Sequence, residues 1–232
     1  MIRIAFDIGG TFTDFVLHDA ASDVTSTLKI PSTPDDPGRA VISGFAELLK
    51  LAGTKAEALG SVLHATTIAT NAILERKGAS TGLITTEGFR DVLIIGRQKR
   101  YETYDLYIDK PEPLIPRQHI LEVSERLDQN GNVINELDMA SVDHAIDTLL
   151  STERETVAVS LLHAYANPVH ERVIRDRIKA RAPKISVSLS SDVSPKFREY
   201  ERTNTTVANA YITPTVERYI SRLQSALGQQ GY

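Results

Sequence analysis

The chain has 232 residues, with 26 Lys or Arg against 30 Asp or Glu and a formal net charge of −4. This balance argues against general binding to nucleic acid or anionic membranes, because both need a basic surface. The absence of cysteine excludes disulfides, cysteine–zinc sites and cysteine nucleophiles. The sequence also has no signal-peptide core and no apolar run of about 18 residues, so we expect a cytoplasmic protein without a membrane partner.

Three short strands are predicted at the start of the chain, over residues 2–8, 12–18 and 24–30. Gly9-Gly10-Thr11 separates the first two, and a turn over 19–23 separates the second from the third. Because these connections are short, we expect an antiparallel meander.

Helices and strands alternate after the meander. Asp36 and Pro37 provide helix-start chemistry, and the apolar residues that follow fall on one helical face until Gly53. We then expect strands over 61–66, 81–85, 157–162 and 185–190, and helices over 67–77, 139–150 (capped by Asp138), 168–181 and 195–227, the last interrupted near Pro214.

The segment from 86 to 135 is less regular. We interpret residues 87–116 as an irregular stretch over the core, and residues 120–135 as a hairpin, because Asn130-Gly131 is a strong tight-turn signal. Together these elements predict an α/β fold with a mixed sheet, a three-stranded antiparallel start, flanking helices and an inserted irregular or hairpin segment.

Residues 7–14 read Asp-Ile-Gly-Gly-Thr-Phe-Thr-Asp, at the end of the first predicted strand. Gly9 and Gly10 permit a tight turn and let a phosphate approach the backbone, whose N–H groups can converge on an anion. Thr11 and Thr13 add hydroxyl donors, and Asp7 and Asp14 suit Mg²⁺.

This turn differs from the two commonest phosphate loops. No lysine follows it, a strand comes next instead of a helix, and a third glycine is missing. The alternative interpretation is an ordinary Gly-Gly hairpin with surface threonines, which predicts no contact with a nucleotide.

An Asp-hydrophobic-Gly-Gly-Thr turn between two strands resembles the first phosphate motif of the superfamily that contains actin and hexokinase. Within it, residues 9–14 (Gly9, Gly10, Thr11, Phe12, Thr13 and Asp14) resemble the hydantoinase A/5-oxoprolinase family, shared with acetone and acetophenone carboxylases. Ala65 stands where the family more often has glycine. Further similar blocks follow in order at residues 64–72, 82–92, 95–98, 161–168 and 197–206.

Five polar side chains lie where the 61–66 strand meets the next helix: His64, Thr66, Thr67, Thr70 and Asn71. Thr66 or Thr67 is suited simply to cap the helix. The alternative places His64 as a catalytic residue and Thr66, Thr67 and Asn71 as substrate contacts at the mouth of the sheet, and the resemblance favours it.

Charged residues in two other blocks are further candidates. We expect one cleft to be lined by Arg90, Asp91, Arg97 and Arg100. The arginines suit an acidic substrate or a phosphoryl group, because arginine binds anions in a bidentate manner; the alternative is solvated surface charge with local pairing. Residues 198–202, including Glu201, follow helical spacing typical of an exposed ion-paired face. The resemblance suggests an inter-domain cleft instead, with Arg90 catalytic and Arg97 and Glu201 at the substrate.

The resemblance implies a ribonuclease-H-like half of a two-lobed ATPase. Residues 1–206 would form this half, with 86–135 as a possible insertion, and 207–232 would be a helical segment leading to a second half. ATP and Mg²⁺ would be the cofactors, with Asp7 as the anchor for the metal.

The chemistry implied for the complete enzyme is phosphorylation of the oxygen of a lactam, imide or ketone, followed by ring opening or carboxylation. The isolated chain would be inactive and would need a second half or a hydantoinase B-like partner subunit, in an oligomer. The alternatives are a subunit of a ketone carboxylase and a non-catalytic actin-like binding or assembly module.

Overall fold

A computed structural model describes residues 1–33, 36–97, 102–105 and 107–229. The fold is mixed α/β and divides into two compact units. The first unit comprises Met1–Asn71 and the chain from Thr215 onward, and the second comprises Ala72–Pro214. The boundary expected at residue 206 falls inside the last helix, α7 (Glu199–Gln229).

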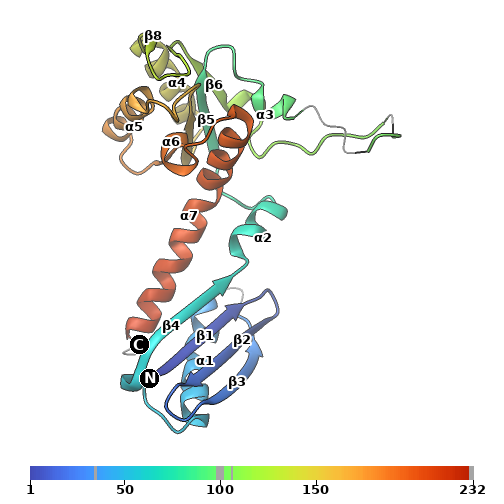
Figure 1. The fold of residues 1–232 in the computed structure, drawn as a ribbon, viewed down its shortest axis with the longest axis vertical. Helices are drawn as coiled ribbons and strands as arrows, with labels where there is room; N and C mark the ends of the chain where they lie inside the picture. The colour runs from blue at the N-terminus through green and yellow to red at the C-terminus, as the bar shows by residue number, and fades with distance from the viewer. Residues whose placement is uncertain (34–35, 98–101, 106, 230–232) are drawn as a thin grey trace. The chain divides into compact units, whose positions relative to one another are not determined.

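A four-stranded mixed sheet forms the centre of the first unit (Figure 1). Its strand order is β3-β2-β1-β4, with antiparallel β1–β2 and β2–β3 pairs and a parallel β1–β4 pair. The predicted three-stranded meander is therefore confirmed. The strands are β1 (Ile2–Ile8), β2 (Phe12–Asp19), β3 (Val24–Pro31) and β4 (Leu59–Thr66).

The core of the first unit lies on one face of this sheet. Register pairs Phe6 with Phe15, both buried, and they pack in one cluster with Phe45 of α1 and Tyr219 of α7. Because side chains alternate along a strand, Asp7 points to the other face. The helices of this unit are α1 (Pro37–Leu51), α2 (Ile68–Leu74, which continues into the second unit) and the short η1 (Ala56–Ala58).

A second four-stranded sheet, entirely parallel, forms the centre of the second unit. Its order is β10-β9-β5-β6, and every residue of β5 and β9 is buried, as expected for central parallel strands. The strands are β5 (Thr81–Thr86), β6 (Ile120–Val123), β9 (Thr156–Ser160) and β10 (Ser186–Leu189). The helices are α3 (Val92–Ile95), η2 (Arg117–His119), α4 (Met139–Ser151), α5 (Val169–Arg181) and α6 (Ser190–Val193).

The predicted hairpin over 120–135 is only partly correct. A small hairpin does form between β7 (Arg126–Leu127) and β8 (Val133–Asn135), and Gly131 in its turn has a φ of 84°. Residues 120–123, however, form β6 and pair in parallel with β5. The local turn signal located the hairpin, but it carries no information about the distant partner of β6.

The predicted helix interruption near Pro214 is wrong, because α7 runs through the proline. A proline in a helix removes one backbone hydrogen bond. Tyr211 is buried in the second unit and Tyr219 in the first. The helix is therefore anchored by packing on both sides of Pro214, which offsets that loss.

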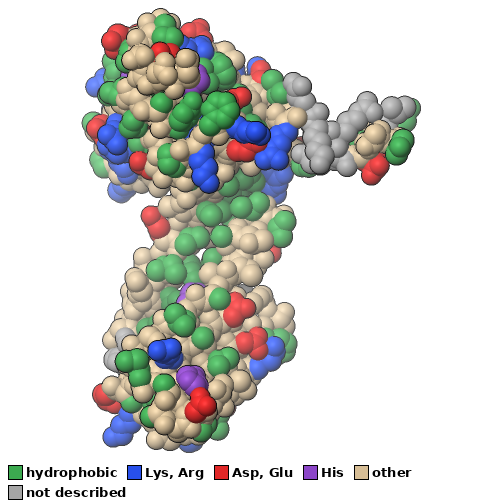
Figure 2. Space-filling view, viewed as in Figure 1, with side chains coloured by type: hydrophobic (Ala, Val, Ile, Leu, Met, Phe, Trp, Pro, Cys, Tyr) green, Lys and Arg blue, Asp and Glu red, His purple; other side chains and the backbone are tan. Residues whose placement is uncertain are grey.

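No helix among the described residues has the length and apolarity to cross a bilayer. On the face shown in Figure 2, basic, acidic and hydrophobic side chains are interspersed.

Because α1 packs closely on the sheet, we expect any side chain at Gly44 to destabilise the fold. A Cβ there would lie 2.3 Å from the ring of the buried Phe15. We expect Gly44→Ala to lower the free energy of unfolding by about 1–3 kcal/mol, since overpacking forces neighbours off their preferred rotamers. Gly228→Ala, where an added Cβ has open space, should raise it by up to about 1 kcal/mol. Urea unfolding measures both, and equal effects would contradict the packing argument.

Candidate functional site

The glycine turn between β1 and β2 is braced by the end of β3. Gly9 N–H donates to Phe12 O at 3.0 Å, and Ser32 N–H donates to Thr11 O at 2.9 Å. The Ser32 hydroxyl donates to Gly9 O at 2.8 Å and lies 2.9 Å from the hydroxyl of Thr13, which is fully buried. Thr13 therefore supports the turn from within.

The outer side of the turn is open. Gly10 and Thr11 are exposed, and a Cβ added at Gly10 would meet no atom within 4 Å. A Cβ at Gly9 would lie 3.0 Å from Phe12 O, so glycine is needed there to close the turn. An anion can approach the backbone at Gly10 and the hydroxyl of Thr11.

Beside the turn, three charged residues form a row across three strands. Register places Asp7 of β1 opposite Asp14 of β2, and Asp14 opposite Lys29 of β3. Lys29 Nζ donates to both Asp14 carboxylate oxygens, at 2.9 and 3.2 Å, and lies 5.1 Å from the Phe12 ring centroid. Like charges directly opposite repel, so Lys29 offsets only part of the charge of this row.

The row fits Mg²⁺, which is bound in nucleotide sites by one or two carboxylates plus waters and phosphate oxygens. No group of three or more potential metal ligands (His, Cys, Asp or Glu) occurs in the described part of the chain. Asp7 and Asp14 would therefore bind Mg²⁺ together with phosphate and water, and would not form a complete cage.

Sequence reasoning missed Lys29, because it looked for a lysine that follows the turn along the chain. The alternation of side chains along the predicted strands could have located Lys29. In a meander whose strands pair as predicted, Lys29 lies on the same face as Asp14 and next to it.

His64 lies on the opposite face of the sheet from Asp7. It pairs in register with Phe6, stacks on that ring at 4.4 Å, and contacts Phe6 O through Nδ1 at 3.4 Å. Its Nε2 is hydrogen-bonded with the Tyr219 hydroxyl. Burial lowers the pKa of His64 and raises the pKa of Tyr219 to about 12.

The other three candidates of this region surround the start of α2. Thr66 Oγ1 accepts from Ile68 N–H at 3.2 Å, and Asn71 Nδ2 donates to Thr67 Oγ1 at 3.3 Å. Thr66 thus makes a bond typical of a helix start. The side chains of Thr66, Thr67 and Asn71 remain exposed.

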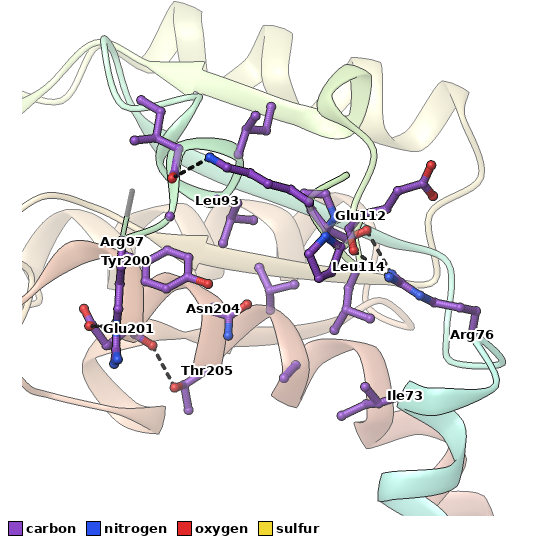
Figure 3. Close-up of a pocket in the computed structure, with 18 of the residues that line it drawn as sticks. Ile73, Arg76, Leu93, Arg97, Glu112, Leu114, Tyr200, Glu201, Asn204 and Thr205 are labelled. Carbon is purple, nitrogen blue, oxygen red and sulfur yellow. Dashed lines mark hydrogen bonds and ion pairs between the residues drawn. The ribbon is translucent and has the colours of Figure 1, made fainter. Parts of the chain in front are cut away.

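In the second unit, Arg97 and Glu201 form an ion pair of 2.7 Å on the wall of a cavity of about 820 Å³ (Figure 3). Arg90 is outside this lining. Its Nη2 donates to Arg117 O at 3.0 Å, and its buried Nε has no partner among the described residues. Arg100 lies outside the residues that the structure describes.

The polar run over 198–202 is not a uniformly exposed face. Arg202 is 2% exposed and donates to Leu161 O at 2.8 Å and to Ser190 Oγ at 3.2 Å. Ser190 Oγ in turn donates to the buried Glu171 at 2.6 Å, whose pKa burial raises. Arg202 therefore holds the second unit together, and its neighbour Glu201 faces the cavity.

Comparisons with known proteins agree on one family. The profile described as Hydantoinase/oxoprolinase N-terminal region matches residues 3–182. Caprolactamase subunit alpha of Pseudomonas jessenii is 35% identical over 99% of this chain and 34% of its own length. The acetophenone carboxylase gamma subunit of Aromatoleum aromaticum is 34% identical over 99% of this chain and 33% of its own.

Among solved structures, nucleotide-free acetone carboxylase superposes with a TM-score of 0.89 at 29% identity, over 99% of this chain and 34% of that one. The chain thus spans about a third of the length of these relatives.

The burial of His64 predicts a pH dependence. Since its pKa is lowered in the folded state, the unfolded chain takes up a proton first as pH falls through about 6.5. Stability contributed by neutral His64 is complete above that pH and is lost as pH falls towards the folded pKa. We expect His64→Phe to remove this component, measured as the difference in urea unfolding between about pH 7.5 and 5.5. An unchanged pH dependence in the variant would contradict it.

Proposed function

This chain belongs to the hydantoinase/oxoprolinase family as its N-terminal region, and from this premise we propose that it is the phosphate-binding portion of an ATP-dependent cyclic amidase. The complete enzyme would phosphorylate the oxygen of a lactam or imide and open the ring hydrolytically. The observation that carries this proposal is the acidic row of Asp7 and Asp14 beside an open glycine turn.

The sheet of the first unit supports a ribonuclease-H-like, actin-like ATPase half. An antiparallel meander followed by a parallel β4 puts the β1–β2 turn at the end of the central strand pair. That is where the resemblance places the β- and γ-phosphates. We retain residues 207–232 as the segment that leads towards a second half.

In this proposal, the backbone N–H of Gly10 and the Thr11 hydroxyl bind phosphate oxygens, while Gly9, Phe12 and Thr13 shape the turn. Asp7 holds Mg²⁺, directly or through water, with Asp14 nearby. When bound, Mg²⁺ neutralises charge on the transferred phosphoryl group. Lys29 would exchange its ion pair with Asp14 for a contact with phosphate.

The contacts of His64 change the role that we propose for it. Both ring nitrogens of His64 are engaged, by Phe6 O and by Tyr219, which favours a positioning role over proton transfer. Arg90 stays a proposed catalytic residue. Thr66, Thr67, Asn71, Arg97 and Glu201 stay proposed substrate contacts.

The complete enzyme would need a second half or a hydantoinase B-like partner subunit. Relatives described as alpha and gamma subunits support such an assembly. We therefore expect the isolated chain to bind phosphate without turnover. The cytoplasmic location stays a prediction.

A ketone carboxylase subunit is the second candidate, supported by the superposition on acetone carboxylase. ATP hydrolysis by the complete assembly with 5-oxoproline, hydantoin or acetophenone distinguishes the two activities. A non-catalytic actin-like module predicts no stimulation by any of the three.

Asp7→Asn tests the phosphate site. Removing the carboxylate charge should abolish Mg-ATP turnover in the complete enzyme and weaken Mg-pyrophosphate binding to this chain by about tenfold or more. Isothermal titration measures the binding. Asp23→Asn is the matched control, because Asp23 is 95% exposed in the same unit and away from the turn. Full activity of Asp7→Asn would refute the assigned role.

Lys29→Met tests the added cation. We expect pyrophosphate affinity to fall about tenfold, since a charge-assisted contact to phosphate is lost. Lys77→Met is the control, because Lys77 is also an exposed lysine in an ion pair, with Glu75 at 2.7 Å. If Lys29 only neutralises Asp14, the Lys29→Met substitution should leave the affinity for pyrophosphate unchanged or increase the affinity for Mg²⁺. Either result would contradict the proposed contact between Lys29 and phosphate.

A further inference from the structure

Tyr219 brings a polar group into the core of the first unit. It lies on the part of α7 that runs beside β4 (Figure 1). Its side chain is 7% exposed and packs in the same cluster as Phe6 and Phe45. A buried tyrosine hydroxyl needs a hydrogen-bond partner, and here the partner is Nε2 of His64. Since phenylalanine would fill the same space, packing alone does not account for the hydroxyl.

The hydrogen bonds that begin at Tyr219 have a defined direction. His64 Nδ1 lies 3.4 Å from Phe6 O, and a carbonyl oxygen only accepts, so Nδ1 carries the ring proton. The ring is neutral, because burial lowers the pKa of His64. Its Nε2 is therefore the acceptor, and the Tyr219 hydroxyl donates to it. Tyr219 thus selects the tautomer of His64 that holds the carbonyl of Phe6.

This chain of hydrogen bonds ends directly behind Asp7. The carbonyl of Phe6 belongs to the peptide bond that joins it to Asp7. In the parallel register of β1 and β4, His64 lies opposite Phe6 and Ala65 lies opposite Asp7. The charge of Asp7 also acts on both rings. It adds to the effect of burial in raising the pKa of Tyr219, and it opposes the effect of burial on His64.

The side chain of Asp7 has no support of its own. It is exposed, and no group among the residues that the structure describes donates a hydrogen bond to its carboxylate. Its position is therefore set by the backbone of β1. Any contact that fixes the Phe6–Asp7 peptide also fixes the direction in which the carboxylate points.

We propose that Tyr219 is a positioning residue of the phosphate site: through His64 it fixes the Phe6–Asp7 peptide and so directs the Asp7 carboxylate towards Mg²⁺. The inference rests on the proposed function, because it requires that Asp7 holds Mg²⁺ beside the glycine turn. It adds to that function a part of α7 that is distant in sequence. The glycine turn and its acidic row then depend on α7 for full affinity.

Tyr219→Phe removes only the hydroxyl and tests the inference by isothermal titration of this chain. With Mg²⁺ present, we expect pyrophosphate to bind about three- to tenfold more weakly, the effect of one lost hydrogen bond. With EDTA in place of Mg²⁺, the titration should match that of the unsubstituted chain, because Gly10 and Thr11 contact phosphate without Asp7. Tyr211→Phe is the matched control. Tyr211 lies on the same helix and is also 7% exposed, and its substitution should change neither titration.

Nitrogen-15 NMR of the His64 ring measures the hydrogen-bond chain itself, with His64→Phe to assign the signals. We expect the Nδ1–H tautomer in the unsubstituted chain. In Tyr219→Phe we expect a mixture with the Nε2–H tautomer, because no hydroxyl then donates to Nε2. The double variant of Tyr219→Phe and His64→Phe should bind Mg-pyrophosphate no more weakly than His64→Phe alone, since both substitutions break the same chain.

The outcomes separate this inference from the proposed function. Unchanged Mg-pyrophosphate affinity in Tyr219→Phe, or an equal loss with EDTA, would overturn the positioning role and leave the phosphate site intact. An Nε2–H tautomer in the unsubstituted chain, or additive effects in the double variant, would also overturn it. If the unsubstituted chain does not bind Mg-pyrophosphate, the phosphate site itself is refuted, and the inference with it.

Discussion

The alternation of side chains along β1 and β2 is the constraint on which the phosphate site depends. Phe6 and Phe15 must share the buried face, and this places Asp7 and Asp14 opposite each other on the other face. A slip of one residue in the register would move the aspartates to the buried face and the phenylalanines to the other face. The core of the first unit therefore specifies its charged row, and Lys29 joins the row by the same rule.

In the second unit, the helical periodicity of α7 likewise determines which side chains are buried and which line the cavity. Along α7, Arg202 and Thr206 point into the core, whereas Tyr200 and Asn204 face the cavity. The burial of Arg202 needs several partners, since an unpaired buried guanidinium is costly; Leu161 O and Ser190 Oγ provide them. The polar run that looks uniform in the sequence thus divides into buried residues and residues that line the cavity.

Local signals predicted local structure well. The meander, the capping of α1 by Asp36 and of α4 by Asp138, and the β7–β8 turn all follow from residues close in sequence. The pairing of β6 with β5, the continuity of α7 through Pro214 and the burial of Arg202 depend on distant partners. No local signal predicts the cavity, although two of its lining residues, Arg97 and Glu201, belong to the blocks that resemble the family.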